Sequence, residues 1–511
     1  MSDEAAPTSI HDILAQFRED SLNNRELGDK FERLICRYLE LDPLYSERFS
    51  NVWMFNEWPR KGETGDIGID IVAEEEATGE FVGIQCKFYR PEHTLSKGDI
   101  DSFVSALGKK IFSSGIIVST TDNWGKNVEA TLKDQTKPIQ RLRVQDLDNS
   151  AVDWSTLSLD ALNKLKLQKK RSPRSHQREA ITAVKNGLAA EGCPDRGQLI
   201  MACGTGKTYT SLAITEEIAM GGHVLFLVPS LALLSQTLRE WTAFSEKPIH
   251  ALAVCSDSQI GRRNAKDADD NDIDVSDLAF PATTNTKSLL TQYNALREKI
   301  KRRKQSKANH GTTVVFSTYH SIASVHEAQK AGLPAFDLVI CDEAHRTTGV
   351  TLADSDESHF VKVHDADYIR AAKRLYMTAT PKVFGDETKS KADEAEATLA
   401  SMDDEDTFGP ELHRLGFGEA VEKDLLTDYK VLVLAVDENY ASKTFQRLIT
   451  SSDSELDLDD AVRITGCWNG LSKKLDHTTT DEAELYGDLA PMRTAIAFSR
   501  SIKDSKNFCY Y

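Results

Sequence analysis

A glycine-rich segment, LIMACGTGKT at residues 199–208, constrains the fold of this chain more than any other feature. Its apolar start predicts a strand, and the small residues Gly204 and Gly206 let backbone N–H groups approach phosphate oxygens closely. The helix expected after the loop points its positive N-terminal end at the same anion. Lys207 supplies a charge for the outer phosphates, and the Thr208 hydroxyl can ligate Mg²⁺. The segment therefore predicts a strand, a phosphate-binding loop and a helix.

Two further motifs follow at the ends of apolar stretches. FDLVICDEAH, at residues 336–345, closes a strand-like run with two carboxylates, and MTATP lies at residues 377–381. We expect Asp342 to hold Mg²⁺ and Glu343 to orient and activate an attacking water. Two solvated acids at a strand end are the alternative, and the phosphate loop upstream weakens it. The three motifs together predict hydrolysis of a nucleoside triphosphate, with ATP and Mg²⁺ bound.

The order of strands and helices predicts the fold class α/β. Short apolar runs alternate with helical segments after Gln198, which indicates a mostly parallel sheet covered on both faces. Expected strands lie at residues 223–230, 312–318, 336–343 and 374–380. The segment 411–511 starts the same pattern again, with strands expected at residues 430–436 and 494–499.

The first 154 residues predict a separate α/β domain. Apolar positions near helical spacing indicate helix over residues 11–40, and another helical segment lies around residues 98–110. Expected strands lie at residues 67–75, 80–89 and 114–121. The chain then divides into residues 1–154, a basic linker at 155–173, a first motor lobe at 174–408, and a connector with an incomplete second lobe at 409–511.

Composition narrows the class of protein. The 511 residues carry a formal net charge of −18, which argues against indiscriminate coating of nucleic acid but leaves local phosphate contacts open. No apolar run approaches the roughly 18–20 residues of a membrane span, and the N-terminus has no secretory signal. The eight cysteines are scattered without metal-binding spacing, as is typical of reduced thiols. We therefore expect a cytoplasmic protein without a membrane partner.

Two N-terminal segments carry a second group of polar residues: GETGDIGIDIVA at residues 62–73 and GEFVGIQCKFY at residues 79–89. They resemble the Mrr-type restriction endonuclease fold of the PD-(D/E)xK superfamily. The resemblance implies that Asp70 and Gln85 hold Mg²⁺ beside a scissile phosphate, while Lys87 stabilises or activates the nucleophile.

The spacing of these residues agrees with that chemistry. Residues two apart in a strand point to the same face, so Gln85 and Lys87 can both reach one metal ion. Glu32 matches the helix glutamate of the fold, whereas Asp66 is a weaker candidate that is more typical of a turn. An inert α/β domain with a coincidental pattern is the alternative, and GIIVST at residues 115–120 favours the nuclease.

Three segments of the middle region match helicase motifs: RSHQREAI at residues 174–181, VPSLALLSQT at 228–237 and STYHS at 317–321. Together with the phosphate loop, DEAH and MTATP, they resemble the first RecA-like lobe of a superfamily 2 helicase of the restriction-translocase kind. Residues 408–431 resemble the connector of that family, and residues 494–508 resemble the first motif of its second lobe.

The helicase resemblance implies roles for individual residues. Gln177 would recognise adenine, and Ser230, Thr318 and Tyr319 would meet DNA backbone phosphates, with structural capping as an equal alternative. The residues expected to hold ATP and its metal ion are Gln177, Gly204, Thr205, Gly206, Lys207, Thr208 and Asp342. Those expected to link the nucleotide to DNA-contacting elements are His345, Thr378 and Thr380.

The nuclease and motor resemblances together indicate the Type ISP group of single-polypeptide restriction–modification enzymes. This implies ATP-driven translocation along double-stranded DNA, cleavage by the nuclease, and methyltransferase and target-recognition domains beyond this chain. Because the arginine finger of the family would lie past Tyr511, we expect slow ATP hydrolysis by this chain alone. Two alternatives stay open: a repair or phage-defence helicase–nuclease without a methyltransferase, and a truncated, non-catalytic DNA-binding remnant.

Overall fold

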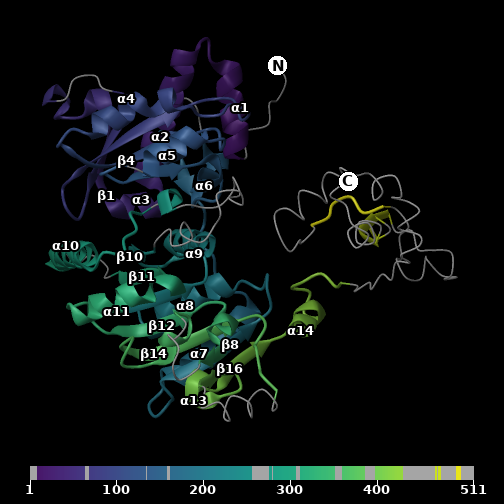
Figure 1. Ribbon diagram of the computed structural model, residues 1–511. Coiled ribbons are helices and arrows are strands. Elements are labelled where there is room, and N and C mark those ends of the chain that lie inside the picture. The colour runs from purple at the N-terminus through teal and green to yellow at the C-terminus, as the bar shows by residue number, and fades with distance from the viewer. Residues whose placement is uncertain are drawn as a thin grey trace, which may run out of the picture. The chain divides into compact units, whose positions relative to one another are not determined.

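The computed structural model divides the chain into two compact units (Figure 1). The first comprises Met1–Ser258 and Ile273–Leu426, and the second Gln259–Asp272 and Thr427–Tyr511. The structure describes residues 9–63, 68–133, 135–157, 162–255, 275–278, 280–305, 311–351, 359–385, 398–429, 466–468, 470–472 and 491–496. Both predicted active sites fall in the first unit, which contains two large sheets.

The first large sheet lies near the N-terminus and has the order β1-β2-β3-β4-β5. The pairs β1–β2 and β2–β3 are antiparallel, whereas β3–β4 and β4–β5 are parallel. Its strands are β1 (Phe49–Met54), β2 (Ile71–Glu75), β3 (Phe81–Lys87), β4 (Phe112–Ser119) and β5 (Ile139–Leu142).

Helices cover both faces of this sheet. They are α1 (Ile10–Asp20), α2 (Asn24–Leu41), α3 (Pro43–Arg48), α4 (Lys97–Leu107), α5 (Lys126–Lys133) and α6 (Val144–Asp148). Along β2, Ile71 and Ala73 belong to a core with α1 and α2, whereas Val72 belongs to a core with α4 and α5. This alternation is the two-residue period of a strand, so the domain has three layers, α/β/α.

Side-chain caps set the first helix boundaries. Ser9 and Asp12 form a capping box at the start of α1. Asn23 Oδ1 accepts hydrogen bonds from the N–H groups of Arg25 and Glu26, each at 3.0 Å, and so begins α2. The single helix expected at residues 11–40 is therefore two helices.

The second large sheet has the order β10-β11-β9-β12-β14-β8-β16, and all its strands are parallel. The strands are β8 (Arg196–Met201), β9 (His223–Val228), β10 (Ile249–Val254), β11 (Thr312–Thr318), β12 (Phe336–Cys341), β14 (Ala371–Thr378) and β16 (Glu411–Leu415). The helices are α7 (Ser175–Leu188), α8 (Lys207–Ile218), α9 (Leu231–Phe244), α10 (Thr286–Gln305), α11 (Ile322–Lys330), α13 (Glu405–Phe408) and α14 (Phe417–Glu422).

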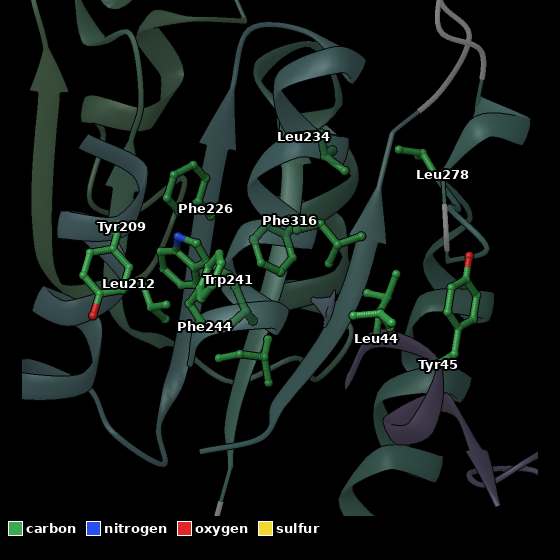
Figure 2. Packing of buried hydrophobic residues seen from close by; sticks show 14 of the residues in the cluster. Leu44, Tyr45, Tyr209, Leu212, Phe226, Leu234, Trp241, Phe244, Leu278 and Phe316 are labelled. Carbon is green, nitrogen blue, oxygen red and sulfur yellow. The ribbon is translucent and has the colours of Figure 1, made fainter. Parts of the chain in front are cut away.

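Two cores cover the faces of this sheet. Helices α7, α8 and α9 contribute to one, with Phe226 and Phe316, and helices α10 and α11 contribute to the other, with Leu225 and Val315. In the first core, Trp241 of α9 contacts Phe226 with ring centroids 5.0 Å apart and Phe316 at 5.8 Å (Figure 2). No helix among the described residues is both long and apolar enough to cross a bilayer.

Short elements complete the unit. Two strand pairs are β6 (Val152–Asp153) with β7 (Lys166–Leu167), and β13 (Gly349–Thr351) with β15 (Thr398–Ala400). The 3-10 turns are η1 (Phe55–Glu57), η2 (Lys61–Glu63), η3 (Trp154–Thr156), η4 (Leu162–Lys164), η5 (Val275–Asp277), η6 (Tyr319–Ser321), η7 (Ala344–Thr347) and η8 (Val361–His364). The expected linker at residues 155–173 thus contains η4 and β7, which pairs back onto β6.

In the two large sheets, the expected strands differ from the observed ones mainly at their ends, and four strands were not expected: β1, β5, β10 and β16. The short strands β6, β7, β13 and β15 were not expected either. The strand expected at residues 430–436 lies outside the described residues. Of the strand expected at residues 494–499, only 494–496 are described, and they form neither helix nor strand.

His364 predicts how the stability of the motor lobe depends on pH. Its Nε2–H donates to the Thr347 carbonyl at 3.0 Å, and its Nδ1 accepts from the Tyr376 hydroxyl at 2.9 Å. Burial lowers the pKa of His364 from 6.5 to about 4. Because the native state resists protonation of His364, the contribution of this residue to stability is fully present above pH 6.5 and is lost as the pH falls toward 4.

We expect the free energy of unfolding to fall by about 2 kcal/mol between pH 7 and pH 5 because of this residue, as measured by urea denaturation. The matched variant His364→Gln keeps a donor and an acceptor but does not titrate. Its pH dependence should be weaker by that amount, and equal slopes for the two proteins would refute the assignment.

Candidate active sites

Three neighbouring strands bring the nucleotide motifs together. Strand β14 lies between β8 and β12, and all three are parallel. Carboxyl ends of parallel strands meet at one edge of a sheet. The loop after β8, the DEAH residues after β12 and the last residues of β14 therefore share one edge, although they are far apart in the sequence.

The phosphate loop has the backbone that its sequence predicts. Gly204 and Gly206 have φ angles of 82° and 87°, the left-handed region that favours glycine. A Cβ atom on Gly206 would lie 2.5 Å from Gln177 Nε2. The Thr205 hydroxyl donates to the Ala202 carbonyl at 2.7 Å, so this side chain shapes the loop. The positive φ angles and the close approach of Gln177 therefore favour glycine in this loop.

Lys207 lies at the first position of α8, where the positive end of the helix faces the loop. Its Nζ is 3.4 Å from the Met201 carbonyl oxygen and 3.9 Å from Cys203 Sγ. Both are weak partners for an ammonium group, so this charge remains available for an anion. Thr208 follows in the same turn, and its carbonyl accepts a hydrogen bond from Trp241 Nε1 at 3.1 Å.

Asp342 and Glu343 stand opposite this lysine. Burial, and then the charge of Glu343, raises the pKa of Asp342 to about 6, while the charge of Lys207 acts in the opposite direction. A divalent cation would favour the ionised form, so the pair suits Mg²⁺. Glu343 has a φ of 50°, an uncommon backbone conformation for a residue with a side chain. Its carboxylate lies 3.4 Å from His345 Nδ1.

His345 connects the DEAH segment to β14. Its Nδ1 lies 2.9 Å from Thr378 Oγ1, and Thr378 Oγ1 accepts from the Thr380 N–H at 3.1 Å. The structure therefore brings together the three residues that were expected to link these motifs. Their role in sensing the nucleotide stays a prediction.

Gln177 holds the start of α7 against the phosphate loop. Its Oε1 accepts from the Arg174 N–H at 2.9 Å, and its Nε2 donates to the Gly206 carbonyl at 3.3 Å. The residue thus lies beside the phosphate loop. Recognition of adenine by Gln177 stays a prediction, and it would require at least one of these hydrogen bonds to rearrange.

The prediction for Tyr319 is wrong. Its side chain is fully buried, and its hydroxyl donates to the Asp342 carbonyl at 2.8 Å, so it supports the DEAH segment and does not meet DNA. Thr318 is also buried, and its hydroxyl donates a hydrogen bond to Ser321 Oγ at 3.2 Å. Ser230 caps α9 by accepting from the Leu233 N–H at 3.4 Å. The structural alternative therefore holds for Thr318 and Tyr319.

The second site forms where β2 and β3 pair. The register places Ile71 opposite Ile84, so Asp70, directly before β2, lies beside Gln85. The Asp70 N–H donates to the Ile84 carbonyl at 2.9 Å, and Asp70 Oδ2 accepts from the Cys86 N–H at 2.7 Å. These hydrogen bonds fix the carboxylate at the strand end.

Gln85 presents a bare oxygen at this site. Its side chain is buried, and its Nε2 donates to the Gly68 carbonyl at 3.0 Å. Its Oε1 is buried without a hydrogen-bond partner. Buried acceptors in native proteins are nearly always satisfied, so this oxygen suits a missing ligand such as Mg²⁺.

Glu32 approaches from α2. Burial, and then the charge of Asp70, raises the pKa of Glu32 to about 7, and Lys87 acts in the opposite direction. The predicted residues are therefore close enough to interact electrostatically. Among the described residues, no group of three or more His, Cys, Asp and Glu side chains could hold a metal ion. A site here requires the neutral oxygen of Gln85, and Asp66 lies outside the described residues.

Sequence reasoning missed the contribution of Thr120, which lies one residue beyond β4. Its buried hydroxyl accepts from the Tyr89 N–H and donates to the Tyr89 carbonyl, both at 2.7 Å. Its own N–H donates to the Lys87 carbonyl at 3.1 Å. Thr120 therefore fixes the end of β3 that carries Lys87. The segment GIIVST favours the nuclease fold in the sequence, but its contact with β3 depends on the parallel pairing of β3 and β4.

Replacement of Thr120 tests this support. Thr120→Val keeps the shape but removes the hydroxyl, so we expect the cleavage rate at saturating DNA to fall about tenfold because Lys87 is displaced. Thr120→Ser keeps the hydroxyl and should cleave like the wild type. The measurement is Mg²⁺-dependent nicking of plasmid DNA, and equal rates for the two variants would refute the role of the hydroxyl.

Replacement of Gly206 tests the phosphate loop. Gly206→Ala adds a Cβ that would meet Gln177 Nε2 at 2.5 Å, so we expect binding of a fluorescent ATP analogue to weaken about tenfold or more. Gly192→Ala is the matched control, because Gly192 has a similar φ of 81° but no atom within 4 Å of its added Cβ. Equal affinities for both variants would contradict the site.

Comparison with known proteins follows the same division of the chain. Residues 40–164 match the family model described as "Restriction endonuclease", and residues 170–383 match "Type III restriction enzyme, res subunit". Probable helicase A859L of African swine fever virus (isolate Pig/Kenya/KEN-50/1950) is 26% identical over 262 residues, 51% of this chain and 24% of the viral protein. The same protein from isolate Tick/Malawi/Lil 20-1/1983 is 26% identical over 303 residues, 59% of this chain and 28% of its own length.

A solved structure extends the similarity over nearly the whole chain. It is described as "ATP-dependent Type ISP restriction-modification enzyme LlaBIII bound to DNA", and it matches with a TM-score of 0.78 and 38% sequence identity. The match covers 98% of this chain and 30% of that chain. This similarity confirms the predicted resemblance and the predicted α/β fold class. The chain carries a restriction endonuclease domain followed by a res-subunit helicase domain, the first expected to cut DNA and the second to hydrolyse ATP, and resembles a Type ISP restriction–modification enzyme.

Proposed function

We propose that this chain couples ATP-driven translocation along double-stranded DNA to Mg²⁺-dependent cleavage, as part of a restriction–modification enzyme. The observation that carries the proposal is the presence of two separate oxygen-rich centres in one compact unit. One lies at Lys207, Asp342 and Glu343, and the other at Asp70 and Gln85. At the first centre, the ammonium group of Lys207 has only weak partners and suits an anion. At the second, Gln85 Oε1 has no hydrogen-bond partner and suits a cation.

In the motor site, the N–H groups of the phosphate loop and the ammonium group of Lys207 bind the outer phosphates of ATP. Thr208 and Asp342 would hold Mg²⁺, which supplies positive charge to the transferred phosphoryl group. Glu343 orients the attacking water and accepts its proton. The strained backbone of Glu343 and its contact with His345 hold the carboxylate in place.

In the nuclease site, Asp70 and Gln85 would hold Mg²⁺, whose charge would favour deprotonation of a water and would polarise the scissile phosphate. Lys87 stabilises the negative charge that develops on that phosphate. Glu32, with a pKa of about 7, can accept a proton from the attacking water near neutral pH. The charge of Mg²⁺ beside Asp70 would favour the ionised form of Glu32.

We further propose double-stranded DNA as the partner, with methyltransferase and target-recognition domains in the same protein. The similarity to LlaBIII supports this, since that structure contains DNA and this chain spans 30% of its length. The matches to viral probable helicases support a motor but carry no information on a methyltransferase. DNA-stimulated ATP hydrolysis would exclude the alternative of a non-catalytic remnant.

Two substitutions should separate the activities. In the complete protein, Lys207→Ala should lower ATP turnover by about 10²-fold or more and abolish ATP-dependent cleavage, because the phosphate charge loses its partner. Asp70→Ala should leave ATP turnover intact while cleavage falls by a similar factor. The measurements are phosphate release and cleavage of linear duplex DNA. A loss of ATP turnover in Asp70→Ala would show that the two-site assignment is wrong.

A further pair of variants tests the neutral metal ligand. Gln85→Glu keeps an oxygen at the bare position and should retain cleavage, whereas Gln85→Leu has a similar shape without an oxygen and should lose it. The measurement is the rate of DNA nicking as a function of Mg²⁺ concentration. Loss of cleavage in Gln85→Glu would point instead to the amide hydrogen bond with the Gly68 carbonyl.

A further inference from the structure

Helix α9 contacts both the nucleotide site and the nuclease domain. On the motor side, Trp241 Nε1 donates to the Thr208 carbonyl at 3.1 Å. Thr208 is in the first turn of α8, directly after the phosphate loop. The Trp241 ring is fully buried and contacts Phe226 and Phe316 of the sheet (Figure 2). Its hydrogen bond to Thr208 therefore connects α9 to the start of α8 inside a close-packed core, which transmits strain.

On the nuclease side, Arg239 of the same helix reaches Asp146 of α6. Its Nη2 lies 3.1 Å from Asp146 Oδ1, and its Nη1 donates to the Asp146 carbonyl at 3.5 Å. Both side chains are at least 90% buried. The Nη2 contact is a charge contact and not an aligned hydrogen bond.

A second buried ion pair joins the same two domains with the opposite polarity. Arg141 of β5 donates two parallel hydrogen bonds to Asp277 of η5, with Nε–Oδ1 at 2.6 Å and Nη2–Oδ2 at 2.8 Å. Arg143 lies between the two pairs, 3.4 Å from Asp146 and 3.9 Å from Asp277. The nuclease domain therefore contributes Arg141 and Asp146, and the motor lobe contributes their partners Asp277 and Arg239.

These buried ion pairs distinguish the interface between the nuclease domain and the motor lobe, called the junction below, from an interface held by apolar contacts alone. Leu44 and Tyr45 of the nuclease also pack in one core with Leu278 of the motor, but apolar surfaces tolerate rotation and sliding (Figure 2). Rotation or sliding of the closed interface would move these buried charges away from their partners, which is unfavourable. The ion pairs therefore fix one orientation of the nuclease on α9.

The junction is also connected to the nuclease site. Asp146 lies in the helix that directly follows β5, and β5 pairs with β4. Thr120, one residue beyond β4, holds the end of β3 at Lys87. A displacement of α6 thus reaches the catalytic lysine through two paired strands and one buried hydroxyl.

We propose that Arg239 is a positioning residue that couples the nucleotide state of the motor to the nuclease through its contact with Asp146. The nuclease then responds to movement of α8 and α9 and does not act as an independently tethered domain. This inference rests on the proposed function, because it assumes an ATP-binding motor and a nuclease in one protein.

The test compares three variants in the complete protein. Arg239→Met replaces the charge with an unbranched apolar chain of similar length, and Asp146→Asn keeps an oxygen that can cap α6 at Arg143 N. Glu240→Gln is the control, since it removes a partly exposed ion pair with Arg171 at the next position of α9. DNA-stimulated ATP turnover and ATP-dependent cleavage of linear duplex DNA are measured for each.

We expect both interface variants to keep ATP turnover within about twofold while ATP-dependent cleavage falls about tenfold, a coupling effect of the size that such contacts carry. Glu240→Gln should resemble the wild type in both assays. Cleavage at the wild-type rate in Asp146→Asn and Arg239→Met would overturn the proposal. An equal loss of both activities would also overturn it, because that is the result of simple destabilisation.

Hydrogen exchange provides a readout that does not depend on cleavage. In the wild type, addition of a non-hydrolysable ATP analogue with Mg²⁺ should change the exchange rates of the amides of Val144–Asp148, and this change should be absent in Asp146→Asn. A wild type that shows no change would overturn the coupling. A wild type that shows the change but never cleaves DNA would refute the proposed function and leave the coupling supported.

Discussion

The pairing of β14 with both β8 and β12 is the constraint on which the motor site depends. These three strands carry the phosphate loop, the DEAH residues and Thr378 to one edge of the sheet. Their burial on both faces fixes the register, because a slip by one residue would move each side chain into the opposite core, where it would not fit the packing. The charges of Lys207 and Asp342 can then lie opposite each other without a long or flexible connection. The chemistry of the site is thus a consequence of ordinary sheet packing.

The sequence predicted the strands that form apolar runs and missed strands whose apolar residues are interrupted by polar ones. The strand at residues 312–318 has the bounds that its apolar run indicated, and β9 and β12 differ only at their ends. Strands β10 and β16 lie at the two edges of the sheet, and β16 is mostly half-exposed or exposed, so its sequence ELHRL lacks an apolar run. The expectation that Tyr319 meets DNA phosphates failed for a different reason. A motif match does not reveal that a side chain points into the core.

In the nuclease site too, the sequence predicted some features and missed others. Strand alternation was enough to place Gln85 and Lys87 on one face, and the structure adds Asp70 beside them. The bare oxygen of Gln85 and the raised pKa of Glu32 depend on burial, which spacing alone does not report. The role of Thr120 depends on contacts between residues about 30 positions apart, and no local pattern contains that information.

The opposite polarity of the two buried ion pairs has a consequence for how such proteins can diversify. A nuclease domain transplanted onto a foreign motor would lose the partners Asp277 and Arg239, and Arg141 and Asp146 would keep only their contacts with Glu129 and Arg143 in the buried interface. Recombination at the boundary between the domains is therefore penalised, even though each domain has its own sheet. The nuclease domain and the motor lobe are therefore expected to be inherited together.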